Sequence, residues 1–250
     1  MALIKTADEI TLLRYSGSVV GKILRALKIA IQPKVTGNEL EKIALQIMNE
    51  HDCQPNFLNY HGFPKAICVS INTEIIHGIP NDIPFRNGDL VSVDVGCQYQ
   101  GYHADAALTV LIGTGTPQAQ KLLATTQQCL TNVIQNLTPG KKVGWIGETI
   151  QNTAENAGFY LNTEYVGHGI GEQLHEKPTI YNKGKANKGI KLMPGMVICV
   201  EPMVLIGSEA VEVLTDKWTV VSKNRQLNCH FEHMLLITAQ GVEVLTNYEK

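Results

Sequence analysis

The sequence has no run of basic residues, no long apolar stretch and no closely spaced pair of cysteines. With a formal net charge of −2, it lacks the clustered lysine and arginine with which proteins bind nucleic acid or anionic membranes. No segment is apolar enough to span a bilayer, and charged residues interrupt the N-terminus before a signal-peptide core can form. The sequence therefore predicts a cytoplasmic protein with neither a membrane nor a nucleic-acid partner.

Several catalytic and metal-binding motifs are also missing. The six cysteines are dispersed without a C-x-x-C pair, which argues against a zinc finger or a thioredoxin-like site and fits free thiols in a reducing compartment. Neither a G-x-S-x-G nucleophile motif nor a Walker loop is present, and no G-x-G-x-x-G follows a strand. The chemistry must therefore come from another kind of residue cluster.

Start and stop signals for helices divide the chain into two similar halves. The capping boxes Thr6-x-x-Glu9 and Thr36-x-x-Glu39 predict a helix over 7–31 and a second, shorter one. Thr116-Pro117 predicts a third helix, ending near Pro139, and a fourth is expected over 144–157. Outside the hairpin described below, strands are predicted at 65–71, 161–166, 196–206, 217–222, 230–238 and 241–246.

Each half therefore reads as long helix, proline, short helix and strands. Pro33 precedes Leu40 by the same offset as Pro139 precedes Ile146. We expect an α+β fold in which a mostly antiparallel sheet is flanked by helices. The two halves, about 1–112 and 113–250, are predicted to form a single catalytic domain over residues 1–250, and two independent domains are the alternative.

The segment "SVDVGCQYQGYHADAAL" (92–108) is predicted to be a β-hairpin with two aspartates on one face. A turn at Tyr99 and Gln100 would place Asp94 directly opposite Asp105, and facing like charges destabilise a strand pair. The neighbours on this face are small, and no lysine or arginine balances the charges. A bound cation would turn the repulsion into attraction. A solvated polar face is the alternative, and a bulge at Gly101 would change the pairing.

Further acidic residues and histidines interrupt the apolar segments of the second half. Glu201 lies within "MVICVEPMVLI" and Glu232 within "HFEHMLLIT", while His168 and His175 belong to "VGHGIGEQLHEKP", a predicted glycine-rich loop after a strand. Unpaired buried carboxylates cost roughly several kcal/mol each, so a shared positive partner is expected. Two aspartates, two glutamates and one histidine balance two divalent ions, and such donors suit manganese, iron, cobalt or catalytic zinc.

The motifs "NTEIIHGIP", "VDVGCQYQGYHAD", "GHGIGEQLHEKP", "VEPMV" and "FEHMLLIT" resemble those of the type I methionine aminopeptidases, in the same order and spacing. The resemblance covers nearly the whole chain. It implies the pita-bread (creatinase/aminopeptidase) fold with an internal pseudo-twofold repeat. It further implies a dinuclear metal-dependent aminopeptidase that removes the initiator methionine when the second residue is small, by attack of a metal-bridging water on the scissile carbonyl.

The resemblance also implies roles for individual residues. Asp94, Asp105 and Glu232 would hold one divalent ion, and Asp105, His168, Glu201 and Glu232 would hold the other. Glu201 would also act as the general base, and His175 would hydrogen-bond the scissile carbonyl or its oxyanion. His77 would lie near the scissile nitrogen, although from the residues alone it reads as a turn histidine before Gly-Ile-Pro.

The methionine side chain would bind against Tyr60, Cys68 and Trp218. Three neighbours depart from the family pattern, because Phe57, Phe63 and Leu174 stand in place of a small or sulfur-containing residue, a tyrosine and a phenylalanine, respectively. All three are apolar, so methionine should fit in a pocket of altered shape. Ala106 replaces a residue that usually carries a hydroxyl group, which removes a hydrogen bond near the ligands.

The remaining expectations concern partners and alternatives. The resemblance implies nascent chains and peptides beginning with methionine as substrates, a transient ribosome contact, a monomeric state and a monovalent cation near Asn72 and Asn228. A catalytically silent binding protein and an X-Pro peptidase are the alternatives. X-Pro peptidases usually carry an extra N-terminal domain, whereas this chain begins with the first catalytic helix and leaves no room for the zinc-binding extension of some type I members.

Overall fold

The computed structural model describes residues 3–249, and its helices begin where the capping residues predict. The α-helices within these residues are α1 (Ala7–Ala30), α2 (Gly37–Glu50), α3 (Pro117–Asn136) and α4 (Val143–Asn156). Both predicted capping boxes form, since Thr6 and Thr36 each exchange hydrogen bonds with the glutamate three residues later. Thr116 caps α3, with Pro117 in its first turn. The four predicted helices are confirmed, with small differences at their ends.

The strands form antiparallel sheets. One sheet contains β1 (Gln54–Pro55), β2 (Cys68–Ile71), β4 (Leu90–Tyr99) and β5 (Tyr102–Leu111). Another contains, in spatial order, β15 (Val242–Val244), β14 (His233–Ile237), β9 (Val197–Val200), β7 (Gly167–Gly169) and β8 (Glu176–Ile180). Two smaller sheets contain β13 (Asn228–His230), β10 (Met203–Leu205) and β6 (Tyr160–Leu161), and β11 (Val211–Val213), β12 (Val220–Ser222) and β3 (Glu74–Ile76).

The β4–β5 hairpin forms, but its register differs from the predicted one. Asp94 pairs with Ala107, and Gly96 pairs with Asp105. The turn lies at Gln100 and Gly101, whose φ angles of 48° and 84° are the left-handed values that favour a tight hairpin turn. The register shifts by an even number of residues, so every side chain keeps its predicted face. The two aspartates therefore share a face as diagonal neighbours rather than as a directly opposed pair.

The predictions of continuous strands over 196–206 and 230–238 are wrong. Glu201 and Pro202 separate β9 from β10, and the segment 231–232 separates β13 from β14. Pro202 has no N–H with which to continue a strand ladder. Val200 pairs with His233 and Met203 pairs with His230, so the two interruptions lie opposite each other. Each interruption places one of the two glutamates at a junction between sheets.

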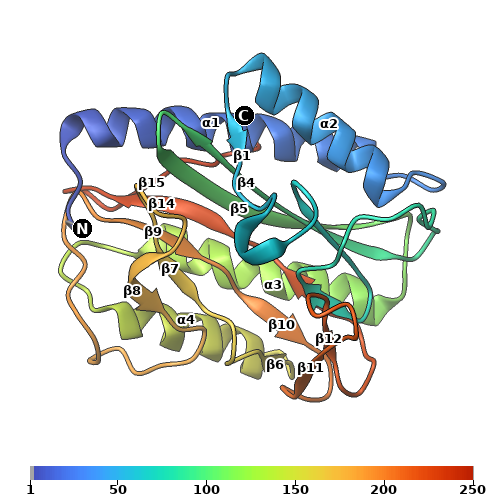
Figure 1. Ribbon diagram of the computed structural model, residues 1–250. Helices are drawn as coiled ribbons and strands as arrows, with labels where there is room; N and C mark the ends of the chain where they lie inside the picture. Colours follow the sequence, from blue (N-terminus) through green and yellow to red (C-terminus); the bar gives the residue numbers. More distant parts are fainter. Residues whose placement is uncertain (1–2, 250) are drawn as a thin grey trace.

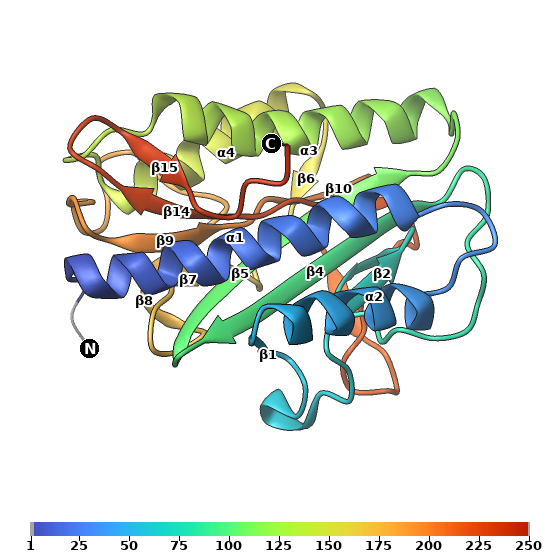
Figure 2. The same ribbon diagram turned by 90° about the horizontal axis from the view of Figure 1, so that it is seen from above.

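The helices pack against the strands and leave the acidic face of the hairpin for the site. In Figures 1 and 2, α1 crosses the long β4–β5 hairpin, and α3 lies along the other half of the molecule. Val91, Val93 and Val95 are fully buried on the hairpin face that α1 covers. One hydrophobic core contains side chains from both halves, among them Leu24 and Leu122.

The prediction of an α+β fold is confirmed, and long helix, short helix and strands recur in the same order in each half. None of the helices within 3–249 combines the length and apolar character needed to cross a membrane.

Candidate metal centre

A cavity of about 390 Å³ opens on the acidic face of the hairpin. All of the residues predicted for catalysis, metal binding and the methionine pocket line it. They are Phe57, Tyr60, Phe63, Cys68, His77, Asp94, Asp105, His168, Leu174, His175, Glu201, Trp218 and Glu232. Residues far apart in the sequence thus converge on one site, and His61, Ile76, Glu164, Tyr165 and Val166 line it as well.

Three carboxylates form the centre of this cavity. Asp94 on β4, Asp105 on β5 and Glu232 at the β13–β14 junction each present an oxygen, and these atoms lie within 4.8 Å of one another. The Glu232 backbone N–H donates to the Ala107 carbonyl at 2.9 Å, which fastens the junction to the hairpin. Asp94 Oδ1, Asp105 Oδ1 and Glu232 Oε1 are buried without a hydrogen-bond partner. Buried polar atoms are normally satisfied, so these orphaned oxygens fit a site for cations.

The electrostatics of the three carboxyl groups lead to the same conclusion. Burial raises the pKa of Asp94 to about 6. Burial and the neighbouring negative charges raise the pKa of both Asp105 and Glu232 well above the usual range. Removal of carboxylates from water disfavours their charged form, whereas a bound cation favours it. Oxygen donors of this kind suit hard or borderline divalent ions.

The other two predicted ligands lie beside this group. His168 Nε2 lies 3.9 Å from Glu201 Oε1, and the other ring nitrogen of His168, Nδ1, lies 2.9 Å from the Gly169 carbonyl oxygen. His168 and Glu232 also belong to a second group of donor atoms within 4.8 Å of one another, which includes Cys199. The prediction that His168 belongs to a loop is wrong, because it lies in the short strand β7 between β8 and β9.

His230 is a residue of the site that the sequence reasoning missed. Its Nε2 lies 3.6 Å from Glu201 Oε2. Burial tends to raise the pKa of Glu201, but the nearby imidazoles of His230 and His168 outweigh burial and lower it. The sequence feature that could have identified His230 is its spacing from a predicted ligand, because it precedes Glu232 by two positions. Glu201 is therefore the acidic residue of the site whose surroundings favour the ionised form.

Two further histidines border the carboxylates. Tyr60 Oη lies 2.9 Å from His175 Nδ1, and the His175 and His168 rings meet edge to face with centroids 4.4 Å apart. Burial, assisted by His168, lowers the pKa of His175 to about 4, so this imidazole is neutral near pH 7. Burial also lowers the pKa of His77, whose ring stands perpendicular to that of Tyr165.

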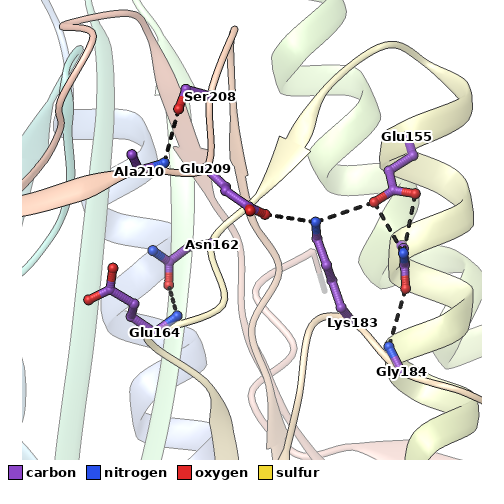
Figure 3. A network of polar contacts seen from close by, with 9 residues as sticks. Glu155, Asn162, Glu164, Lys183, Gly184, Ser208, Glu209 and Ala210 are labelled. Atoms are coloured by element: carbon purple, nitrogen blue, oxygen red, sulfur yellow. Dashed lines mark hydrogen bonds and ion pairs between the residues drawn. The ribbon is translucent and has the colours of Figure 1, made fainter.

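A turn after β6 sets the position of Tyr165. The buried Asn162 Oδ1 accepts hydrogen bonds from the backbone N–H groups of Glu164 and Tyr165, at 3.0 and 2.7 Å. Figure 3 shows Asn162 beside Glu164, with Lys183 contacting Glu209 and Glu155 in the neighbouring ion-pair network. The turn thus supports the wall of the cavity that faces His77.

An apolar pocket adjoins the carboxylates. Phe57, Phe63, Cys68 and Leu174 are buried, and the Trp218 ring packs edge to face on Phe63 with centroids 5.2 Å apart. Cys68 pairs with Asp94 across β2 and β4, so this wall lies next to the acidic group. Phe57, Phe63 and Leu174, the three departures from the family pattern, are buried apolar side chains of the cavity lining.

The two asparagines predicted near a monovalent cation also meet. The Asn228 backbone N–H donates to the Asn72 carbonyl at 2.9 Å, and Asn228 Nδ2 donates to the Thr73 carbonyl at 2.7 Å. Asn228 Oδ1 is buried without a hydrogen-bond partner. A cation bound at this oxygen stays a prediction.

Comparisons with known proteins relate the whole chain to one group of enzymes. A family model described as metallopeptidase family M24 matches residues 11–239. A methionine aminopeptidase of Mycoplasma capricolum is 44% identical over the full length of both chains. Methionine aminopeptidase 1 of Bacillus subtilis is 40% identical over 98% of this chain and 99% of its own.

Solved structures agree with this relationship. A methionine aminopeptidase from Thermotoga maritima has a TM-score of 0.96 at 40% identity, over 98% of this chain and 99% of that one. A prolidase from Pyrococcus furiosus, at 19% identity, has a TM-score of 0.79 over 99% of this chain and 66% of its own, which shows the shared fold alone. These neighbours confirm the predicted pita-bread fold.

Proposed function

Because the chain belongs to metallopeptidase family M24 and, within it, to the methionine aminopeptidases, we propose that it removes the N-terminal methionine from proteins and peptides. The second residue of the substrate would be small. One observation carries the proposal. Asp94, Asp105 and Glu232 bring buried, unpartnered oxygens together beside an apolar pocket that can take a methionine side chain.

Two divalent ions are the cofactor that fits this donor set. Asp94, Asp105 and Glu232 would hold one ion, and Asp105, His168, Glu201 and Glu232 would hold the other. The four carboxylates carry four negative charges, which two divalent ions balance. Cobalt, manganese, iron and zinc all suit carboxylate and imidazole donors. Bound there, the ions would activate a water molecule and polarise the scissile carbonyl.

The chain's own side chains supply the proton transfers and orientation. Glu201 would accept a proton from the attacking water, because its surroundings keep it ionised. The neutral His175 would donate a hydrogen bond to the scissile carbonyl and to the oxyanion that forms from it. The Tyr60 hydroxyl at its Nδ1 holds the ring in place. His77, on the facing wall, would contact the scissile nitrogen and assist the leaving amine.

The apolar wall would recognise the methionine side chain. Tyr60, Cys68 and Trp218 would contact it together with Phe57, Phe63 and Leu174, whose rings and branched chain shape the pocket. Thioethers pack favourably against aromatic rings. Such a pocket favours the binding of an unbranched apolar side chain. A charged side chain would be buried there without a partner, which disfavours its binding.

The proposed function includes a cellular compartment, an oligomeric state, a ribosome contact and a monovalent cation. We place the enzyme in the cytoplasm, acting as a monomer on nascent chains during a transient contact with the ribosome. The six free cysteines suit a reducing compartment. A monovalent cation near Asn72 and Asn228 would stabilise the loops around β3. Sedimentation with ribosomes tests the ribosome contact, and size-exclusion chromatography tests the monomeric state.

A peptide panel tests the function. Metal-free protein is reloaded with cobalt or manganese and given Met-Gly-Met, Met-Leu-Met and Ala-Pro peptides. We expect metal-dependent release of methionine, fastest from Met-Gly-Met and slow from Met-Leu-Met. Cleavage of Ala-Pro alone would identify an X-Pro peptidase, and no cleavage of any peptide would favour a silent binding protein.

A further inference from the structure

One deeply buried ion pair lies outside the ligands and pocket residues. Lys5 Nζ lies 2.6 Å from Glu176 Oε2, and only 4% of each side chain is exposed. Among the described residues, the other ion pairs made by lysine and arginine are more exposed. Burial of two charges is offset only by close geometry and additional hydrogen bonds. The position of this pair therefore requires a physical reason.

Glu176 closes the loop that carries His175. It is the first residue of β8 and directly follows His175. Its Oε1 accepts a hydrogen bond from the Gln173 backbone N–H at 3.1 Å, and the Gly171 N–H donates to the Gln173 carbonyl at 3.1 Å. A side chain at Gly171 would collide with both Lys5 and Glu176. The Glu176 carboxylate thus lies inside the loop 170–175 and bonds to its backbone. No space remains there for a side chain at position 171.

Lys5 is itself anchored far from this loop in sequence. Its backbone N–H donates to the Gly195 carbonyl at 2.8 Å, just before β9. In Figure 1 the segment that precedes α1 runs along the same edge of the molecule as β8, and the Lys5–Glu176 ion pair joins the two. The Lys5 backbone is therefore anchored independently of Glu176, and the buried ammonium group lies against the loop as a counter-charge for Glu176.

We propose that Lys5 is a positioning residue for His175, a role that rests on the proposed function. By holding Glu176, Lys5 fixes the loop that presents His175 to the scissile carbonyl. Within residues 3–249 the imidazole has one hydrogen bond, to Tyr60, so its place depends on the backbone that carries it. A donor aimed at a developing oxyanion acts only at hydrogen-bond distance.

The experiment compares Lys5→Met, which keeps the aliphatic length, with Lys28→Met as a matched control. Lys28 forms an exposed pair with Glu249 on the surface. The rates of methionine release from a Met-Gly-Met peptide are measured with saturating manganese, well below the melting temperature, together with hydrogen exchange of residues 170–176. We expect Lys5→Met to lower kcat about 10- to 100-fold, with KM changed less than about threefold, because displacement by about 1 Å disrupts the transition state more than binding. The control should change neither.

A double variant, Lys5→Met with Glu176→Gln, separates positioning from stability. It leaves no unpaired buried charge, so its melting temperature should recover relative to Lys5→Met, while kcat stays low and exchange of 170–176 stays fast. Recovery of kcat together with the melting temperature would overturn the proposal, as would a folded Lys5→Met with wild-type kcat.

If Lys5→Met does not fold, the double variant decides. If the wild-type chain releases no methionine, the proposed function fails, and slow wild-type exchange that Lys5→Met accelerates would still show that Lys5 holds the loop.

Discussion

The acidic residues of the cavity differ in the charge that their surroundings favour. Asp105 and Glu232 are surrounded by other carboxylates, and burial with those charges raises the pKa of both. Glu201 lies 3.6 Å from His230 Nε2, and its pKa is lowered in spite of burial. A general base must be ionised before it can accept a proton. In the metal-free protein, Glu201 is therefore the acidic residue whose surroundings favour the ionised form, which supports the proposal that it acts as the base.

The substitution Glu201→Gln tests that assignment. The amide has nearly the same size but cannot accept the proton. We therefore expect kcat to fall by about 10²- to 10⁴-fold, which is the usual contribution of general-base catalysis to the rate. Glu209→Gln is the control, because Glu209 pairs with Lys183 outside the cavity, and its kcat should stay close to wild type. Single-turnover release of methionine and metal content are measured together. A loss smaller than about tenfold with metal content unchanged would contradict the role of Glu201.

Tyr60→Phe separates two roles of a single side chain. The ring is kept for methionine packing, but the hydroxyl group 2.9 Å from His175 Nδ1 is lost. One hydrogen bond is worth about 1 kcal/mol, so kcat should fall roughly fivefold with little change in KM. Tyr160→Phe, on an exposed tyrosine, serves as the control. A raised KM with unchanged kcat would mean that Tyr60 contributes packing alone.

Interruptions of secondary structure bring the site together at the scale of elements. The apolar runs around Glu201 and Glu232 were predicted as continuous strands, since hydrophobicity alone does not reveal where a strand changes sheets. The hairpin register was misplaced because the sequence does not fix which residues turn. Nevertheless, alternation placed Asp94 and Asp105 on the correct shared face, because the register error was even. His230 was missed because its role depends on the approach of β13 to Glu201, a contact between distant segments.

Gly96→Val tests the fit between the hairpin and the segment that carries Phe57. Gly96 pairs with Asp105, and a Cβ at this position would lie 2.7 Å from Asn56 Nδ2 and 2.9 Å from Phe57 Cε1. Valine should displace this segment, raise KM, and lower the free energy of unfolding by about 1–3 kcal/mol, as overpacking does.

Gln98→Val is the control for Gly96→Val, because Gln98 is on the same face of β4 and is partly exposed. Its free energy of unfolding should change by less than about 0.5 kcal/mol. Urea unfolding and steady-state kinetics measure both variants. Equal free energies of unfolding for Gly96→Val and wild type would contradict this expectation. They would show that the segment carrying Phe57 can move without destabilising the protein.

The candidate ligands unite the two halves of the molecule. Asp94 and Asp105 come from the first half, whereas His168, Glu201 and Glu232 come from the second. Without ions, their like charges oppose the packing of the halves, since carboxylates removed from water repel one another at short range. With ions, the same side chains attract a common centre. The stability of the whole molecule should therefore depend on metal, and the sign of its pH dependence should depend on metal as well.

The pH dependence of melting with and without metal tests this expectation. In the metal-free protein the pKa of Asp94 is raised from 3.8 to about 6, so the folded state binds more protons than the unfolded state between these values. Stability of this form should therefore fall as the pH rises from about 4 to 6. It should fall further at higher pH, because the pKa of both Asp105 and Glu232 is also raised. The loaded protein should show the opposite slope, since protons compete with the ions for the same oxygens.

At neutral pH the loaded protein should therefore melt higher, by an amount equivalent to about 2.7 kcal/mol for each site at an ion concentration 100 times its Kd. Differential scanning calorimetry with and without a chelator, at pH 5, 6 and 7.5, measures the effect. Asp105→Asn is the matched control, because it removes one of the repelling charges and should make the metal-free form more stable than metal-free wild type at pH 7.5. If chelation leaves the melting temperature unchanged at pH 7.5 while metal analysis shows that the ions are gone, repulsion among the carboxylates does not govern the stability of the fold.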